Sequence, residues 1–572
     1  MKNYFSKTIF LLLLLAVPVY SWSQTDKFFY KAAGSPVNPK VKASWNKYYT
    51  NQGVNDLCTQ LSKAYPNLVS LEVIGKSYQG RDIVLLTISD KKAKDPSGKP
   101  GYWIDGNIHS VELQGTEMAL YTAWYLCEMY ADNEFIKKLL AEKTFYIAPT
   151  INPDGREFFT SQTVPPRSGL APRDNDRDGL FDEDGFDDLN GDGEVSIMRI
   201  KNPSGTMRTD PSDPRKMIRV KPGETGEYDY LGIEGIDNDG DGLINEDTPG
   251  GYDGNRDWGF NWEPNYVQNG ADKYPFTFPE NQAVRDFVAR HPNISGSQSF
   301  HNTGGMILRG PSIKGGGAEV YSRQDDEVIN SIGEIGEKII PGYRLLTIWK
   351  DMYTVWGGEL DWMHGNGIFV FSNELWNPYL MFYDTANTDQ YDFDRLLLFD
   401  DAFVPWQKVN HPQYGEIEIG GFKKNFGRLH PGFMLETDAH RNAAFCIYNA
   451  NQLPVLEIKD ISVKNIDGGL KEVSATVANT RAIPTHSASN MKFRIDHPVY
   501  VTLEGGSVIA AMIVNDKLLN NTTEQKKNPK RLEIKNIAGN SQVDLRWIVK
   551  GGSEFTVKVE SEKGGNTSAK AK

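Results

Sequence analysis

The chain has 572 residues and a formal net charge of −13, with 24% charged and 39% hydrophobic residues. This length is sufficient for two or three domains. The acidic balance excludes nucleic acid as the expected partner, because proteins that bind phosphate backbones present basic surfaces.

Residues 1–23 have the pattern of a secretory signal peptide. Lys2 and Lys7 precede a mostly leucine run over 9–19, and small residues follow at the spacing of a cleavage site. That run is too short to span a bilayer, and no later segment is apolar enough to do so. We therefore expect a mature protein that starts near Gln24 and is secreted to the periplasm or the medium. The odd number of cysteines, three, favours buried free thiols over a disulfide framework.

Hydrophobic patterns over residues 54–149 predict alternating helices and strands. The sequence NPDG that follows at 152–155 is typical of a turn. In chain order we expect a helix over 54–61, a hairpin of strands 68–74 and 82–89, a strand over 102–108, a buried helix over 115–130 and a strand over 144–149.

His109 and Glu112 lie between the strand over 102–108 and the buried helix. An imidazole nitrogen and a carboxylate oxygen both bind zinc, and a spacing of three lets one loop or helical turn direct both at one ion. With nine His and 75 acidic residues in the chain, such a pair occurs about once by chance, so the motif alone decides nothing. Its place is informative, because open α/β sheets bind ligands where a strand ends and a helix begins.

Residues 156–251 have little apolar periodicity and many Asp, Asn and Gly. Two segments, 174–184 and 237–247, resemble each other, and a shorter one follows the same pattern at 188–193. Alternate oxygen ligands followed by Gly suit a calcium loop, although no Glu stands at the twelfth position of an EF-hand. The pattern resembles the calcium loops of thrombospondin-type repeats, and a solvated acidic loop is the alternative. The candidate calcium ligands are Asp174, Asp176, Asp178, Asp182, Asp188, Asn190, Asp192, Asp237, Asp239 and Asp241.

Regular structure is expected again after residue 278. Strands that alternate with helices predict an α/β fold with a mixed, mostly parallel sheet covered by helices on both faces. From residue 453 short alternating strands predict a β-sandwich up to residue 562, and a polar tail over 563–572 is expected to be disordered. The expected elements are a helix over 279–290, a strand over 293–300, a helix over 328–339 and a strand over 367–372.

A catalytic zinc ion keeps three protein ligands and one open position, so a third ligand is needed beside His109 and Glu112. His301 stands at the carboxyl end of a predicted strand, as the first pair does. His364 is the rival candidate.

Seven motifs occur in an order that resembles the zinc carboxypeptidase family, typified by carboxypeptidase A. The resemblance covers roughly residues 45–450, and seven ordered motifs are far more specific than any one of them. The motifs are the hairpin turn 75–81, HSVE at 109–112, NPDG at 152–155, NRDW at 255–258, SFH at 299–301, Tyr353 with GGELDW at 357–362, and EL at 374–375.

The resemblance implies a catalytic domain over residues 24–450, with 156–251 as an acidic insertion and 451–562 as the separate sandwich. His109, Glu112 and His301 would then hold one zinc ion, and Glu374 would be the general base and acid. Asn255, Arg256 and Tyr353 would grip the free carboxylate of a peptide substrate. The implied activity is the hydrolysis of C-terminal peptide bonds.

The family also implies an arginine that stabilises the oxyanion, and Arg199 is the best match, with Arg208, Arg215 and Arg219 as rivals. Because acidic segments flank Arg199, we expect structural calcium to fix the segment that carries it.

Leu360 matches the position that forms the floor of the family's side-chain pocket, which suggests apolar or aromatic C-terminal residues. Arg309 is an alternative that would favour an acidic residue, so the specificity stays open.

Two other functions remain in competition. A cell-wall peptide amidase of the same family would use the same zinc chemistry without needing the set Asn255, Arg256 and Tyr353. A non-catalytic, calcium-stabilised binding protein would have no reason to keep Glu374 together with all three metal ligands. The oligomeric state and the role of the sandwich are not indicated by the sequence.

Overall fold

The structure is a computed structural model that describes residues 32–164, 168–174, 177–315, 321–376, 381–382, 389–424 and 426–571. The predicted signal peptide lies outside these residues. Residues 40–572 form one compact unit, and every element below belongs to it. Within the described part of the chain, no helix has both the length and the apolar character that crossing a membrane requires.

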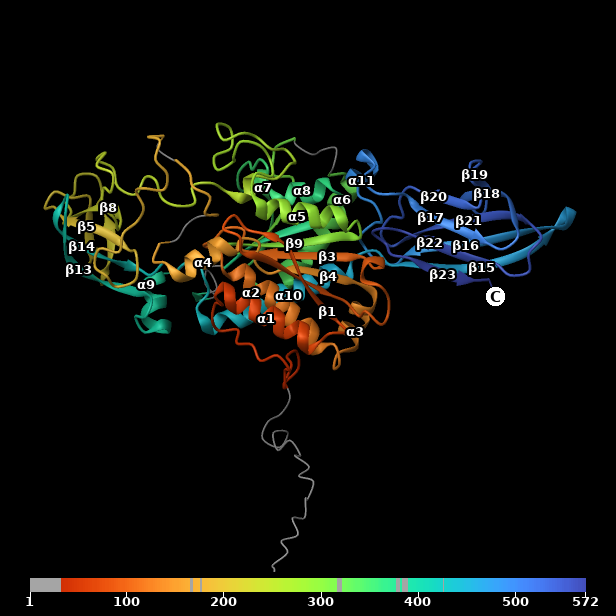
Figure 1. Ribbon diagram of the computed structural model, residues 1–572, viewed down its shortest axis with the longest axis horizontal. Helices are drawn as coiled ribbons and strands as arrows, with labels where there is room; N and C mark the ends of the chain where they lie inside the picture. Colours follow the sequence, from red (N-terminus) through yellow and green to blue (C-terminus); the bar gives the residue numbers. More distant parts are fainter. Residues whose placement is uncertain are drawn as a thin grey trace, which may run out of the picture. The chain divides into compact units, whose positions relative to one another are not determined.

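An eight-stranded sheet is the largest of the sheets in the described part of the chain (Figure 1). Four of its seven neighbouring pairs are parallel and three are antiparallel, so the predicted mixed sheet is confirmed. Across the sheet the strands are β1 (Val69–Lys76), β2 (Asp82–Ile88), β4 (Thr144–Ala148), β3 (Gly101–Gly106), β9 (Ile294–Asn302), β12 (Phe369–Leu375), β10 (Met306–Arg309) and β11 (Arg344–Thr347).

Helices cover both faces of this sheet because successive side chains of a strand point to opposite sides. On β3, Tyr102 and Ile104 pack with one group of helices, whereas Trp103 packs with the other. The first group is α1 (Asn51–Ala64), α2 (Gln114–Met129), α3 (Glu134–Glu142), α6 (Arg323–Ile339) and α10 (Gly432–Asn451). The second group is α5 (Pro279–Arg290), α7 (Ile348–Asp351) and α8 (Glu359–Gly365).

Helix α2 is buried along its whole length, as its apolar sequence predicted. Cys127 lies on it, and Cys58 and Cys446 are likewise buried and free, which confirms that the cysteines form no disulfide. The NPDG sequence is not the predicted turn. Asn152 caps the N-terminus of α4 (Pro153–Ser161), where its Oδ1 accepts a hydrogen bond from Gly155 N at 2.8 Å. Pro153 is tolerated there because the first helical turn needs no N–H from it.

A second sheet of six antiparallel strands contains much of the segment that we expected to consist of loops. Four of its strands come from the insertion and two from a hairpin about 200 residues later. Its core is small and consists of Met198, Ile417 and Ile419. The strands in order are β13 (Phe403–His411), β14 (Gly415–Phe422), β5 (Ile197–Lys201), β8 (Tyr228–Ile233), β6 (Met207–Asp210) and β7 (Asp213–Arg219).

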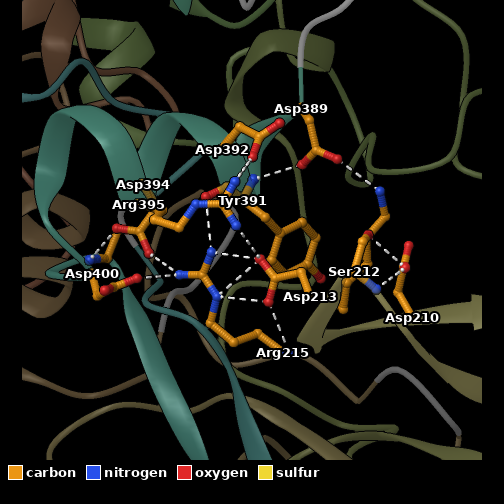
Figure 2. A network of polar contacts seen from close by, with 12 residues as sticks. Asp210, Ser212, Asp213, Arg215, Asp389, Tyr391, Asp392, Asp394, Arg395 and Asp400 are labelled. Carbon is orange, nitrogen blue, oxygen red and sulfur yellow. Dashed lines mark hydrogen bonds and ion pairs between the residues drawn. The ribbon is translucent and has the colours of Figure 1, made fainter.

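Arg215 on β7 anchors this sheet to the segment 389–400, which contains α9 (Gln390–Phe393) and precedes β13 (Figure 2). Its guanidinium donates to Asp213 at 2.8 Å, to Asp394 at 2.9 Å and to Asp400 at 2.7 Å. Asp394 is fully buried, so its charge depends on this arginine. The insertion is therefore held by ion pairs as well as by strand pairing.

The C-terminal region consists of two sheets that share one hydrophobic core, as predicted for a β-sandwich. Trp547, Val473 and Val557 lie at its centre. One sheet contains β15 (Leu456–Ile466), β16 (Leu470–Asn479), β21 (Ser541–Lys550), β18 (Ser507–Asp516) and β19 (Asn521–Glu524). Helix α11 (Ala488–Phe493) follows β16 in the chain. The other contains β20 (Arg531–Ile534), β17 (Val499–Glu504), β22 (Thr556–Glu560) and β23 (Thr567–Lys570).

Strand β23 corrects the expectation of a disordered tail over 563–572. It pairs with β22 in antiparallel register, with Ala569 opposite Val557. No apolar pattern in the sequence predicts this strand, because hydrogen bonds between backbones, rather than apolar side chains, hold it in place.

Candidate active site

Three neighbouring parallel strands, β3, β9 and β12, end at the same edge of the central sheet. His109 follows β3, whereas His301 lies near the end of β9 and Glu374 near the end of β12. Glu374 is the register partner of His301. Because parallel strands share a direction, motifs far apart in the sequence meet at this edge.

His109, Glu112 and His301 form a buried cluster of metal-ligand type, each being at most 4% exposed. The Oε2 atom of Glu112 lies 2.9 Å from His109 Nδ1 and 3.0 Å from His301 Nδ1. The two Nδ1 atoms are 3.3 Å apart. Two imidazole nitrogens and one carboxylate oxygen converging in a buried corner match the donor set of a catalytic zinc site.

The outer nitrogens of both imidazoles have partners that orient the rings. His109 Nε2 lies 2.8 Å from Asp253 Oδ1, and His301 Nε2 lies 3.3 Å from Ser299 Oγ. A histidine that donates its outer N–H to a carboxylate directs the lone pair of its other nitrogen at the metal. The sequence reasoning missed Asp253, although its place two residues before Asn255 was a usable signal.

The electrostatics of Glu112 favour its ionised form. Burial alone would raise the pKa of this carboxyl, but the adjacent imidazoles of His109 and His301 outweigh burial and hold the pKa well below its usual value. A carboxylate that stays ionised is ready to bind a cation.

Arg156 holds the loop that carries the first two ligands. It is fully buried and pairs with Glu117 at 2.7 Å. It also donates to Asn107 Oδ1 and to Leu113 O, both at 3.1 Å, so it binds the two ends of the loop 107–113. The sequence reasoning missed this residue, which directly follows NPDG.

Asp154 of the NPDG sequence binds the tip of the β1–β2 hairpin. It accepts hydrogen bonds from Ser77 Oγ at 2.6 Å and from Gln79 N at 2.7 Å, and Arg81 lies 2.8 Å away. Two of the ordered motifs thus contact each other and support the site instead of lining it.

A cavity of about 270 Å³ opens at the metal-ligand cluster. Tyr353 is 56% exposed, whereas Arg256 and Leu360 are buried. Arg256 Nη1 donates to the backbone oxygen of Asn255 at 2.7 Å. The structure brings all the predicted zinc ligands, the predicted base and the predicted substrate residues to this one cavity: His109, Glu112, His301, Glu374, Asn255, Arg256, Tyr353 and Leu360.

Arg199 is not among the residues that line the cavity, where its predicted role would place it. It lies on β5, where its guanidinium pairs with Glu418 at 2.7 Å. The same guanidinium lies 4.1 Å from the ring of Tyr228 and 3.8 Å from that of Trp406. These contacts hold Arg199 in the six-stranded sheet.

Arg428 is not among the arginines that the sequence analysis considered. It lines the cavity, and its Nη1 lies 3.4 Å from the backbone oxygen of Asn302, next to the ligand His301. It follows the last recognised motif by more than 50 residues, so the sequence carries no local signal for it.

The two rival residues of the sequence analysis have other surroundings. Arg309 donates to Asn330 Oδ1 at 2.7 Å and pairs with Asp326, both on α6. His364 stacks on Tyr321 with ring centroids 3.9 Å apart. Neither residue lines the cavity.

The acidic loops bring carboxylates together in three overlapping groups, each with ligand atoms within 4.8 Å. Asp239 belongs to all three. Burial and neighbouring carboxylates raise the pKa of Glu183 and of Glu246 to about 7. The groups are Asp178 with Glu183 and Asp239, Asp184 with Asp239 and Glu246, and Asp237 with Asp239 and Asp241.

The other predicted calcium ligands stand apart from these groups. Asp174 Oδ2 accepts a hydrogen bond from Gly179 N at 3.2 Å, and Asp188 Oδ2 accepts one from Gly193 N at 2.9 Å. Asp176 lies outside the described residues. Asp182, Asn190 and Asp192 likewise belong to none of the groups.

Two family models match the chain. One, described as zinc carboxypeptidase, matches residues 54–391, which is more than half of the chain. The other, described as a domain of unknown function (DUF8731), matches residues 455–572.

Curated relatives align over short segments. A zinc carboxypeptidase of Saccharothrix mutabilis subsp. capreolus is 35% identical over 116 residues, which is 20% of this chain and 26% of the relative. Carboxypeptidase B of Astacus astacus is 36% identical over 19% of this chain and 34% of its own length. Carboxypeptidase Z of Rattus norvegicus is 35% identical over 18% and 14%. The alignments thus span about a third or less of each of these relatives.

Solved structures resemble the chain at low identity. The structure of thrombin activatable fibrinolysis inhibitor has 16% identity and a TM-score of 0.43, over 73% of this chain and 80% of that one. Carboxypeptidase A from Helicoverpa armigera has 17% identity and a TM-score of 0.43, over 74% and 76%.

Proposed function

Because the chain belongs to the zinc carboxypeptidase family, we propose that it hydrolyses the C-terminal peptide bond of peptides or proteins. The observation that carries this proposal is the single cavity lined by His109, Glu112 and His301 together with Glu374 and Arg256. A metal-ligand set, a carboxylate base and an arginine for a chain end are the three parts that such a reaction needs.

His109, Glu112 and His301 would hold the zinc ion through Nδ1, Oε2 and Nδ1. When bound, zinc supplies Lewis-acid polarisation of the scissile carbonyl and makes water more acidic. Asp253 keeps the ring of His109 in the orientation that this binding requires.

Glu374 acts as the general base and then as the general acid. Its carboxylate accepts a proton from the attacking water and passes it to the nitrogen of the leaving amine. Two observations support this role: Glu374 is the register partner of His301 on the neighbouring strand, and its partial burial limits competing water.

Asn255, Arg256 and Tyr353 bind the free carboxylate of the substrate. The planar guanidinium of Arg256 forms two parallel hydrogen bonds with such a group. The side chain of Asn255 is oriented because its Oδ1 accepts a hydrogen bond from Glu359 N at 2.9 Å. A site that requires a free carboxylate accepts chain ends, which makes the enzyme an exopeptidase.

Arg428 takes the role first expected of Arg199. It is the other arginine, besides Arg256, among the residues that line the cavity. A guanidinium beside the metal ligands stabilises the negative charge that develops on the carbonyl oxygen.

The test is incubation of the purified protein with a mixed peptide library, followed by mass spectrometry. Loss of single residues from the C-terminus, abolished by a zinc chelator and restored by zinc, supports the proposal. Cleavage of only cell-wall peptides would favour the amidase, and a protein without zinc or activity would favour the binding protein.

Two further parts of the proposal lie outside the cavity. The grouped carboxylates around Asp239 bind calcium, because oxygen ligands from two loops converge there and the pKa values of Glu183 and Glu246 lie near 7 without a cation. Secretion follows from the pattern of residues 1–23 and is checked by N-terminal sequencing of the exported protein.

A further inference from the structure

Two buried carboxyl groups, those of Asp105 and Glu359, lie together next to Ser299, whose Oγ is 3.3 Å from Nε2 of His301. Both residues are at most 1% exposed. Ser299 Oγ donates to Asp105 Oδ1 at 2.7 Å and lies 3.4 Å from Glu359 Oε2. Trp103 Nε1 donates to Asp105 Oδ2 at 2.6 Å. Asp105 is therefore well bonded, whereas Glu359 depends on fewer contacts.

Glu359 lines the cavity, and its Oε1 atom is buried without a hydrogen-bond partner in the described part of the chain. Neither carboxyl forms an ion pair with a lysine or arginine among the residues that the structure describes. Burial and the nearby Asp105 raise the pKa of Glu359 well above its usual value. A buried carboxyl with an unsatisfied oxygen is costly unless a ligand completes it.

The walls of the cavity near Glu359 are apolar. Leu308, Ile348, Val355 and Leu360 line it and belong to one buried hydrophobic cluster. Apolar walls with one acidic group match a side chain that has a long aliphatic stem and a cationic end.

We infer that Glu359 makes this cavity a pocket for a C-terminal lysine or arginine, an inference that rests on the proposed carboxypeptidase activity. The methylene groups of the substrate side chain pack against Leu360 and its neighbours, and the cation binds Glu359. Asp105 and Glu359 share one proton and therefore carry a single negative charge between them. One substrate cation neutralises this charge while the shared proton stays in place.

This inference changes the specificity expected from Leu360 alone. An apolar side chain would fill the walls but would leave Glu359 Oε1 unpaired. An acidic substrate side chain would meet the carboxyl group of Glu359. Arg309, which would have favoured such a side chain, is bound to α6 and does not face the pocket. Only a basic side chain satisfies both the walls and the acidic end.

The first experiment compares hydrolysis by the wild-type zinc enzyme of benzoyl-glycyl-lysine, benzoyl-glycyl-norleucine and benzoyl-glycyl-glutamate. Norleucine matches the lysine stem without the ammonium group. We expect kcat/KM for lysine to exceed that for norleucine by about tenfold or more, with glutamate slowest. A smaller ratio overturns the inference while leaving the proposed function intact, whereas no cleavage of any of the three peptides overturns both.

The second experiment measures the same ratio in Glu359→Gln, which keeps the shape of the side chain and removes its charge. We expect the ratio of lysine to norleucine to fall by about 30-fold or more, because the substrate cation is left unpaired. Glu134→Gln is the control, since Glu134 is 87% exposed on α3, and its ratio should equal that of the wild type. Zinc content and melting temperature verify that the variants fold.

A third experiment needs no variant and compares the inhibition of the wild-type enzyme by free lysine with its inhibition by free norleucine. We expect lysine to inhibit more strongly, and equal inhibition by the two amino acids contradicts the inference.

Discussion

Glu374 lies opposite His301 on the neighbouring strand, so its carboxylate can act on water at the metal ligands without contributing to the ligand set. Replacement of Glu374 by Gln removes the proton acceptor and keeps the size of the side chain. We expect kcat/KM to fall by about 1,000-fold, which is typical for the loss of a general base. The measurement is peptide hydrolysis together with zinc content, which should stay at the wild-type value. Activity within tenfold of the wild type would exclude Glu374 as the base.

Asp253 acts through His109 and is therefore a positioning residue. Its Oδ1 lies 2.8 Å from His109 Nε2 and also accepts a hydrogen bond from Asn255 N at 2.8 Å. Asp253→Asn should weaken zinc binding by about 10- to 100-fold, because the imidazole loses its charged partner. Competition with a chelator measures the affinity. The melting temperature of the zinc-free protein should not change, and a fall in that temperature with unchanged zinc affinity would show a merely structural role.

The residues foreseen from the sequence are those with a short motif of their own. His109, Glu112 and His301 follow predicted strands, so their convergence at one edge of the sheet could be predicted. Glu359 lies inside a recognised motif, but its burial against Asp105 depends on the pairing of β3 with β9, which no local pattern reveals.

Elements were predictable where one apolar pattern persisted over a whole turn or strand. Helix α5 begins and ends at the predicted residues, and β1 and β2 form the predicted hairpin. The six-stranded sheet escaped prediction because its core has few apolar residues. Strand β5 also finds its partner β14 more than 200 residues away, and sequence patterns do not report such distant pairing.

The ion-pair network of Arg215 should contribute measurably to the stability of the six-stranded sheet (Figure 2). Arg215→Ala leaves the fully buried Asp394 without its cation. Removal of one partner from a buried pair typically costs about 3 kcal/mol of the free energy of unfolding. Chemical denaturation followed by tryptophan fluorescence measures this change.

Arg323 provides the matched control because its side chain is 91% exposed and pairs with Glu327 on the surface of α6. Arg323→Ala should change the free energy of unfolding by no more than about 0.5 kcal/mol. Equal effects of the two substitutions would show that the network does not hold the sheet.

At the scale of the whole molecule, the acidic loops should influence stability rather than catalysis. Asp239 links all three carboxylate groups, whereas Arg199, the residue that would have connected these loops to the cavity, is held by Glu418. Removal of calcium with a chelator that spares zinc should therefore lower the melting temperature and leave kcat/KM unchanged below the transition. A parallel loss of activity at low temperature would contradict this separation.

The pH dependence of stability provides a sharper test of calcium binding. Burial and adjacent carboxylates raise the pKa of Glu183 and of Glu246 from 4.5 to about 7 in the folded chain. The folded state therefore binds more protons than the unfolded state, so stability falls as the pH rises from about 4.5 to 7. Glu280 and Asp438, whose pKa values burial raises to about 7, act in the same direction, whereas Glu112 acts in the opposite one. The informative quantity is therefore the difference between melting curves with and without calcium.

We expect calcium to raise the melting temperature at neutral pH and to have little effect near pH 4.5, because only the ionised carboxylates bind the cation. Asp239→Asn should abolish this calcium-dependent increase, since it removes a ligand from all three groups at once. Asp401→Asn is the control, because Asp401 is 87% exposed and belongs to none of the groups. A calcium effect that is independent of pH, or that persists in Asp239→Asn, would place calcium elsewhere and leave the loops as solvated acidic segments.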